Sequence, residues 1–197
     1  MNSATVREPV IAPVASDDDE VLYEIIDGQR IGLPPMSVLS VWIASQLLTY
    51  IGTYGRTQDL GRVLSEALFH LPLPADRNRR PDLAFVSYQR WAKNRPLPPL
   101  DNAWNVLPNL VVEVVSPTDR AEDLLQKVAE YLGAGVTVVW VIYPRCQQVY
   151  VYESSTNVRA LTRADELDGG TVLPGFRLQL GELFLEPAAN GVAPDDA

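Results

Sequence analysis

Cysteine and histidine are almost missing from this chain of 197 residues. A single cysteine, Cys146, excludes an internal disulfide and favours a reducing, cytoplasmic location. One histidine, His70, together with one cysteine cannot supply the usual ligands of a zinc site. The sequence therefore disfavours a zinc site.

Long apolar runs are also missing. The longest one covers residues 136–143, far short of the roughly 20 residues that a membrane-spanning helix needs. The first twenty residues lack a basic start followed by an apolar stretch, so we expect no secretory signal. The sequence therefore predicts a protein without a membrane partner.

Basic residues are outnumbered, with 16 Lys and Arg against 25 Asp and Glu, which gives a net charge of −9. This balance excludes a general nucleic-acid coat protein, which would show a basic stripe. The balance reverses only over residues 77–95, where Asp82 is the one acidic residue. The basic residues there are Arg77, Arg79, Arg80, Arg90, Lys93 and Arg95. This segment is either a solvated loop or a phosphate-contacting surface.

The chain is long enough for one domain with flexible ends. Its apolar content of 47% is ordinary for a folded protein with its own core. Residues 1–20 and 186–197 are rich in Pro, Ala and Asp and show little periodicity, so we expect flexible tails. Residues 21–185 are predicted to form a single domain.

Local signals at the start of this domain predict a hairpin and a helix. Asp27-Gly28 stands between two short strand-like pieces, which is typical of a tight hairpin turn. Ser37 follows two prolines and predicts the N-cap of a helix that ends at Gly52 and Gly55. Further strands are expected over residues 61–71 and 81–87.

A strand–helix–strand unit follows. Residues 109–115 (NLVVEVV) are apolar on both faces except for Glu113, which predicts a central strand covered on both sides. Ser116 is expected to cap a helix that starts with Pro117, and 136–143 is a second buried strand. The two strands should be parallel with a right-handed crossover. The predicted class is an α/β fold with a mixed β-sheet flanked by helices and a βαβ crossover.

Two carboxylates and a lysine are the candidate site. Glu113 within an apolar strand needs a partner or a proton. Asp82 opens the strand after Arg79-Arg80-Pro81, and if the two strands are neighbours the carboxylates converge as Mg²⁺ ligands. Lys127 lies on the flank of the apolar stripe of the following helix, from which its ammonium can reach Glu113.

A structural alternative stays open at this point. Glu113 can instead form a salt bridge with Lys127 or Arg80 that has no catalytic role. A two-carboxylate hydrolase of another class, such as a glycosidase, is a weaker alternative, since no aromatic-lined sugar cleft is apparent.

Several segments together resemble a known family. They are YEIIDGQR, PDLAFVSYQRW, PNLVVEVVSPTDRAEDLLQKVAEYLGAGVTVVWVIYP and DGGTVLPGFRLQLGELF. They resemble the bacterial restriction endonuclease family that was long classed as a domain of unknown function, within the PD-(D/E)xK nuclease superfamily. The resemblance covers almost all of residues 21–185. It implies a restriction-endonuclease-like core.

The resemblance also implies roles for single residues. Asp82 and Glu113 match the metal-binding positions of the family. The superfamily lysine normally stands two residues after the glutamate, where this chain has Val115, and Lys127 matches variants whose lysine lies on the next helix. Glu24 matches a recurrent acidic position with an accessory role in metal binding or structure. A histidine that many members carry after the proline turn is absent here.

Two functions are therefore expected as alternatives. The first is a DNA endonuclease that depends on Mg²⁺, with Mn²⁺ as a substitute, and that acts as a homodimer as superfamily members often do. Its metal ligands would be Asp82, Glu113 and the carbonyl oxygen of Val114. Lys127 would position water, and Arg79 and Arg80 would contact the DNA backbone. The second is a catalytically inactive nuclease fold that binds nucleic acid or protein.

Overall fold

The computed structural model describes residues 21–99 and 102–185. The predicted tails, residues 1–20 and 186–197, lie outside the described residues. Within the described ranges, no helix combines the length and the apolar character that crossing a membrane requires.

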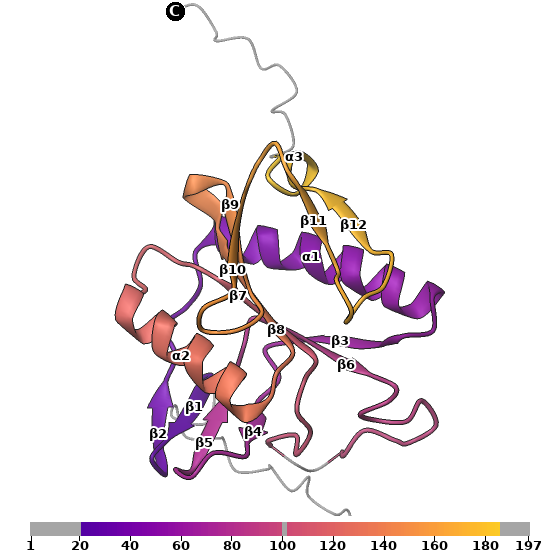
Figure 1. Cartoon of the computed structure of the whole chain (residues 1–197). Coiled ribbons are helices and arrows are strands. Elements are labelled where there is room, and N and C mark those ends of the chain that lie inside the picture. The colour runs from indigo at the N-terminus through magenta and orange to yellow at the C-terminus, as the bar shows by residue number, and fades with distance from the viewer. Residues whose placement is uncertain (1–20, 100–101, 186–197) are drawn as a thin grey trace, which may run out of the picture.

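A six-stranded mixed sheet forms the centre of the molecule, with strand order β10-β9-β8-β7-β6-β3 (Figure 1). Its strands are β3 (Gly61–Ser65), β6 (Leu83–Ser87), β7 (Leu110–Val114), β8 (Val138–Tyr143), β9 (Gln148–Tyr152) and β10 (Val158–Thr162). Only β7 and β8 pair in parallel, and helix α2 (Ala121–Ala134) connects them. The predicted α/β class with a mixed sheet and a βαβ crossover is confirmed.

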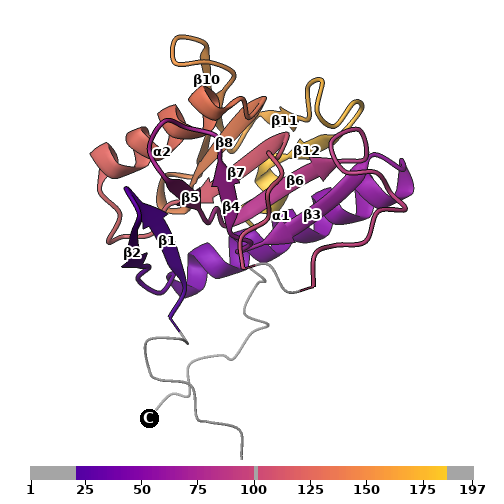
Figure 2. The same ribbon diagram turned by 90° about the horizontal axis from the view of Figure 1, so that it is seen from below.

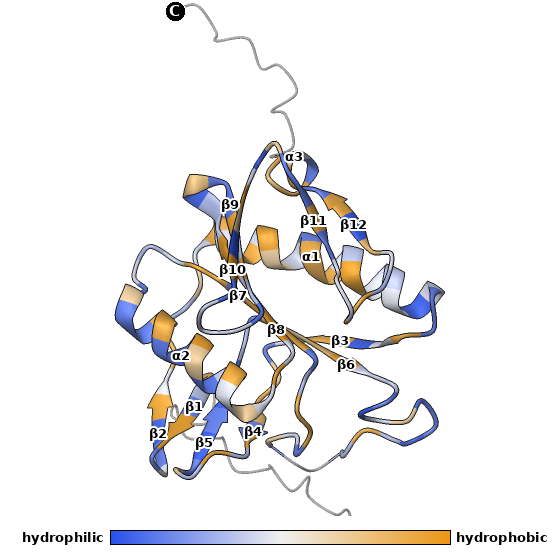
Figure 3. Cartoon of the chain, in the orientation of Figure 1, coloured by the Kyte–Doolittle hydropathy of each residue, from blue (hydrophilic) through white to orange (hydrophobic). Residues whose placement is uncertain are grey.

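Helices α1 (Val38–Thr57) and α2 cover opposite faces of this sheet (Figure 2). In β7, Leu110, Val112 and Val114 join the core cluster that includes residues of α1, whereas Val111 joins the cluster of α2. The hydropathy colours show β8 as apolar along its length and α2 with both apolar and polar positions (Figure 3). Because side chains alternate along a strand, Glu113 lies on the α2 face with Val111.

A smaller antiparallel sheet combines the N-terminal β1–β2 hairpin with two strands from later in the chain. Its strand order is β2-β1-β5-β4. Its strands are β1 (Tyr23–Ile26), β2 (Gln29–Gly32), β4 (Phe69–Leu71) and β5 (Arg77–Arg79). The hairpin at Asp27-Gly28 is confirmed, with φ of 52° and 75° at these two residues. Both values are positive, as the favoured two-residue hairpin turn requires.

The prediction of one strand over residues 61–71 is wrong. The chain turns at Glu66, whose φ is 50°, so that β3 pairs with β6 in the central sheet and β4 pairs with β5 in the smaller sheet. The mixed apolar pattern of this segment therefore reflects two short strands in different sheets.

The predicted start of α1 is confirmed, whereas its predicted end is wrong. Ser37 is the N-cap, and its hydroxyl accepts a hydrogen bond from the Ser40 backbone N–H at 3.1 Å. The helix continues through Gly52 and Gly55 to Thr57. A Cβ at either glycine would lie 3.1 Å from Val63 or Phe85, respectively, of the sheet below. The glycines therefore allow close packing of the helix on the sheet and do not end it.

Helix α2 begins later than predicted. Its first residue is Ala121, and Ser116 instead closes a turn with Asp119. The Ser116 N–H donates to the Asp119 carboxylate at 2.7 Å, and the Asp119 N–H donates to the Ser116 carbonyl at 3.1 Å. The helix ends at Ala134, and its C-cap is Gly135, whose φ of 100° is suited to glycine. The local turn satisfies polar groups that a longer helix would have used.

Short elements complete the domain at the edge of the core cluster that includes α1. They are the 3₁₀ helix η2 (Pro144–Cys146), strands β11 (Glu166–Asp168) and β12 (Arg177–Gln179), and helix α3 (Leu180–Leu183). The last two strands form their own antiparallel pair.

Candidate active site

A cavity of about 600 Å³ lies between the β1–β2 hairpin, the end of β7 and the start of α2. All the residues that the sequence singled out line it: Glu24, Arg79, Arg80, Asp82, Glu113, Val114 and Lys127. The fold thus brings together positions from four separate segments of the chain: β1, the passage from β5 to β6, β7 and α2. Their individual contacts decide which of them are available for chemistry.

Asp82 is held against the end of β7. Strands β6 and β7 are antiparallel neighbours, with Leu83 opposite Val112. Asp82, one residue before β6, therefore lies level with the end of β7, and its carboxylate accepts a hydrogen bond from the Val114 N–H at 2.5 Å. The two predicted strands are thus neighbours, and both carboxylates line the same cavity.

Glu113 has contacts on both of its oxygens. The Tyr131 hydroxyl donates to Oε1 at 2.7 Å, and Lys127 Nζ lies 3.5 Å from Oε2. Lys127 and Tyr131 are four residues apart on α2, so they lie on the same face of that helix. Sequence reasoning did not assign a role to Tyr131. The signal that could have found it is this four-residue spacing on the helix that covers Glu113.

Glu24 is 1% exposed and contacts three groups. Its Oε2 accepts from Arg79 at 2.6 Å, and its Oε1 accepts from the Arg80 backbone N–H at 3.1 Å. Lys127 Nζ lies 3.2 Å from the same Oε1. Since both of its oxygens are engaged by the protein, Glu24 holds Lys127 in place beside Glu113.

Arg79 belongs to a buried network of ion pairs. Its guanidinium contacts Glu24 and Glu130, each at 2.6 Å, and the residue is 4% exposed. Arg77 extends the network, with Asp27 at 3.2 Å and Glu130 at 3.4 Å. This part of the basic segment is therefore neither a solvated loop nor a phosphate-contacting surface. A contact of Arg79 with DNA would require these pairs to break.

Arg80 has a different position at the cavity. Its side chain donates to the carbonyl oxygens of Tyr23, at 3.1 Å, and of Glu66. Neither partner is a charged side chain. Of the two arginines expected to contact DNA, Arg80 alone keeps a formal charge that no carboxylate in these contacts neutralises.

Burial dominates the electrostatics of the two carboxylates. Burial, followed by the charge of Glu113, raises the pKa of Asp82 to about 8. Burial also raises the pKa of Glu113, against the opposing effects of Lys127 and Tyr131. For Lys127, burial lowers the pKa, but the charges of Glu113 and Glu24 outweigh it and the pKa lies above its ordinary value. Burial and the charge of Glu113 therefore favour the protonated form of Asp82 when no cation is bound.

The raised pKa of Asp82 predicts a pH dependence of stability. Between its ordinary pKa of 3.8 and about 8, the folded protein binds a proton that the unfolded chain has released. The free energy of unfolding should therefore fall as pH rises through this window. We expect the melting temperature without divalent cations to fall by several degrees from pH 5 to pH 8, as thermal denaturation would show.

The matched variants for this prediction are Asp82→Asn and Asp59→Asn. Asp82→Asn keeps an oxygen for the Val114 N–H and cannot ionise, so its melting temperature should change less over the same range. Asp59 is a surface residue, with a side chain 62% exposed, and its variant should keep the wild-type dependence. If the melting temperatures of wild type and Asp82→Asn changed equally with pH, the pH dependence could not be assigned to Asp82.

The donor set fits a divalent cation with few protein ligands. Among the described residues, no group of three or more His, Cys, Asp or Glu is arranged to hold a metal ion. When both are ionised, the buried carboxylates of Asp82 and Glu113 repel each other, and a bound cation would offset that repulsion. Mg²⁺ is commonly bound by one or two carboxylates, with water and substrate phosphate completing its shell.

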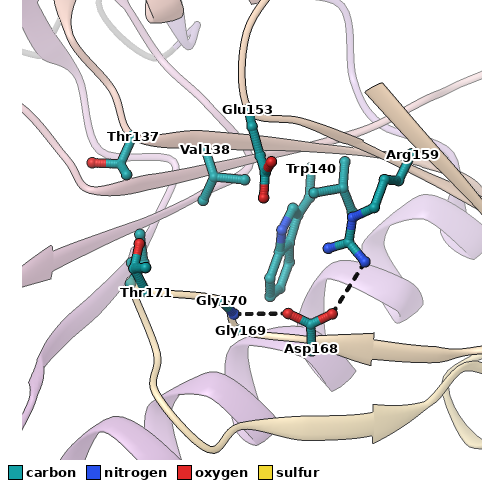
Figure 4. A pocket seen from close by; sticks show the side chains of 11 residues that line it. Thr137, Val138, Trp140, Glu153, Arg159, Asp168, Gly169, Gly170 and Thr171 are labelled. Carbon is teal, nitrogen blue, oxygen red and sulfur yellow. Dashed lines mark hydrogen bonds and ion pairs between the residues drawn. The ribbon is translucent and has the colours of Figure 1, made fainter. Parts of the chain in front are cut away.

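A second cavity, of about 310 Å³, lies beside β8, β9 and β10 (Figure 4). Its polar groups pair with one another: Arg159 contacts Asp168 at 3.2 Å, and Asp168 accepts from the Gly170 N–H at 3.0 Å. None of the residues predicted from the sequence lines it. The candidate active site is therefore the first cavity.

Comparisons with known proteins agree with the predicted fold and family. The crystal structure of a putative nuclease of DUF820 from Anabaena variabilis ATCC 29413 superposes with a TM-score of 0.72 at 20% sequence identity. The match covers 82% of this chain and 89% of the Anabaena chain, so the two share their fold. No curated protein matches the sequence. The family model Uma2, described as "Putative restriction endonuclease", matches residues 11–181. Since that match spans most of the sequence, the chain belongs to the Uma2 family of putative restriction endonucleases.

Proposed function

We propose that this protein is a Mg²⁺-dependent endonuclease that hydrolyses phosphodiester bonds of DNA, with Mn²⁺ as a substitute cation. One observation carries the proposal: Asp82 and Glu113 line one cavity together with Lys127, in a member of a restriction endonuclease family. Two carboxylates and a lysine are sufficient to bind a cation and to stabilise charge at a phosphate.

Each side chain has a role that follows from its contacts. The carboxylates of Asp82 and Glu113 and the carbonyl oxygen of Val114 would hold the cation. When bound, the cation supplies Lewis acidity toward the phosphate and lowers the pKa of bound water. Lys127 carries a positive charge that Glu24 and Glu113 keep in place, so it would orient the attacking water and stabilise negative charge on the phosphate.

DNA binding would rest on few basic contacts. Arg80 at the cavity is our candidate for a contact with the phosphate backbone, while Arg79 acts indirectly by holding Glu24. Since the chain has a net charge of −9, binding should be weak outside the cavity and should fall steeply with salt. We also propose a homodimer, because two sites would cut two strands, and a cytoplasmic location, where the lone cysteine stays reduced.

The test combines cation binding with cleavage. At a Mg²⁺ concentration of one hundred times the dissociation constant, wild type should gain about 2.7 kcal/mol of stability, or roughly 5–10 °C in melting temperature. It should also cleave plasmid DNA with Mg²⁺ or Mn²⁺. Asp82→Ala should lose both properties. Glu122→Ala, at a side chain that is 90% exposed on α2, should keep both.

The inactive-module alternative has one observation in its favour. Lys127 forms ion pairs with both Glu113 and Glu24, as a purely structural site also would. This alternative predicts that Mg²⁺ neither stabilises wild type nor leads to cleavage, while DNA or a protein partner still binds. That result would overturn the nuclease proposal.

A further inference from the structure

We infer that Tyr131 is a positioning residue that makes the site selective for Mg²⁺ over Ca²⁺, because its hydroxyl engages Oε1 of Glu113, so that a cation would bind through Oε2, the oxygen that faces Lys127. The inference rests on the proposed function, since it concerns the same metal site. Tyr131 is not one of the predicted site residues Asp82, Glu113 and Lys127. Its proposed effect is on cation selectivity, which those three residues alone do not explain.

The contacts of Glu113 distinguish its two oxygens. Oε1 accepts the Tyr131 hydroxyl at 2.7 Å, while Oε2 is the oxygen that faces Lys127 Nζ, at 3.5 Å. Glu113 is itself 6% exposed, and its side chain lines the cavity. The hydrogen bond therefore fixes which oxygen of the carboxylate is directed toward the lysine.

The tyrosine ring cannot easily move away. Tyr131 is 0% exposed and is packed in the core cluster that also contains Val111, Val128 and Val139. A phenylalanine would fill the same apolar space. The buried hydroxyl is an extra polar group whose hydrogen-bond partner is Glu113, and burying such a group without a partner is costly. The Tyr131 hydroxyl therefore serves to orient the Glu113 carboxylate.

This orientation has different consequences for the two cations. Ca²⁺ accepts six to eight oxygens in flexible geometry and commonly takes both oxygens of one carboxylate. Mg²⁺ requires a compact octahedral shell, which a carboxylate binding through one oxygen suits. Because the Tyr131 hydroxyl occupies one lone pair of Oε1 and fixes its direction, binding of a cation through both oxygens of Glu113 is disfavoured relative to binding through Oε2 alone. The Tyr131 hydroxyl therefore lowers the affinity for Ca²⁺ more than the affinity for Mg²⁺.

The test is a calorimetric titration of the full chain with MgCl₂ and, separately, with CaCl₂. Tyr131→Phe removes only the hydroxyl. We expect the ratio of the Ca²⁺ to the Mg²⁺ dissociation constant to fall about tenfold or more in this variant, within the range that residues behind metal ligands usually contribute. A variant that only lost packing or stability would bind both cations more weakly by the same factor, and the ratio of the dissociation constants would stay unchanged.

Tyr54→Phe is the matched control. Its hydroxyl donates to the Pro174 carbonyl at the same distance, 2.7 Å, away from the cavity. This variant should keep the wild-type ratio. An unchanged ratio in Tyr131→Phe, in a wild type that binds and uses Mg²⁺, would overturn the inference and leave the proposed function intact. A wild type that binds neither cation would overturn both.

A second measurement needs no variant of Tyr131. Infrared difference spectra of wild type with and without Mg²⁺ report whether a carboxylate binds a cation through one oxygen or through two, and Glu113→Gln assigns the bands. The expected result is a one-oxygen pattern for Glu113. A two-oxygen pattern would overturn the inference even if Tyr131→Phe failed to fold.

Discussion

Lys127→Met is expected to lower the rate of DNA cleavage by roughly 10²–10⁴-fold, the range typical of a group that moves a proton or stabilises charge in the transition state. Methionine keeps an unbranched apolar stem on the flank of α2 but has no charge. Mg²⁺ binding should be retained or become tighter, because Glu113 and Glu24 lose a competing positive charge. The measurements are single-turnover cleavage at saturating Mg²⁺ and calorimetric titration with the same salt.

The other lysine of the chain supplies the control. Lys93 pairs with Asp59 at the surface, and its side chain is 64% exposed. Lys93→Met should cleave at nearly the wild-type rate. Cleavage by Lys127→Met at the wild-type rate would show that Lys127 only neutralises the two glutamates, and the role in positioning water would have to be given up.

Arg79→Met is expected to destabilise the fold by about 3–5 kcal/mol, because it leaves Glu24 and Glu130 without their closest cationic partner in the interior. Urea denaturation followed by circular dichroism measures the change. The double variant Arg79→Met/Glu24→Gln should recover part of the loss, since it removes one of the two buried charges that have lost their closest partner.

An exposed pair provides the comparison. Arg177 contacts Glu166 at 2.8 Å, but its side chain is 65% exposed. Arg177→Met should therefore change the free energy of unfolding by less than about 1 kcal/mol. If Arg79→Met and Arg177→Met lowered the free energy of unfolding equally, burial would not explain how much the ion pairs of Arg79 contribute to stability.

The sequence predicted the central part of the fold because local patterns and burial agree there. An apolar strand, an amphipathic helix and a second apolar strand leave few arrangements other than a parallel βαβ unit. The hairpin at Asp27-Gly28 and the cap at Ser37 were predicted for the same reason, since each depends on adjacent residues. The helix boundaries at Gly55 and Ala121 were missed, because close packing on the sheet and a side-chain turn decided them.

The role of the basic segment could not be predicted locally. Arg79 pairs with Glu24, 55 positions earlier, and with Glu130, 51 positions later. A run of arginines has the same appearance in the sequence whether its charges face solvent, phosphate or buried carboxylates. Pairing of β5 with β1 brings Arg79 beside Glu24, and helix α2 supplies Glu130 in the interior.

By itself, the sequence determined the α/β class, the resemblance to a nuclease family, and the candidate residues Asp82, Glu113 and Lys127. The fold class and the candidate residues depend on periodicity and on the cost of burying a charge, and the resemblance depends on several motifs, all of which are visible along the chain. The tertiary structure alone decided that Glu24 holds Lys127, that Tyr131 holds Glu113, and that Arg79 is internal. Hydrogen bonds and ion pairs act over a few ångströms, and only folding brings side chains so distant in the chain to that separation.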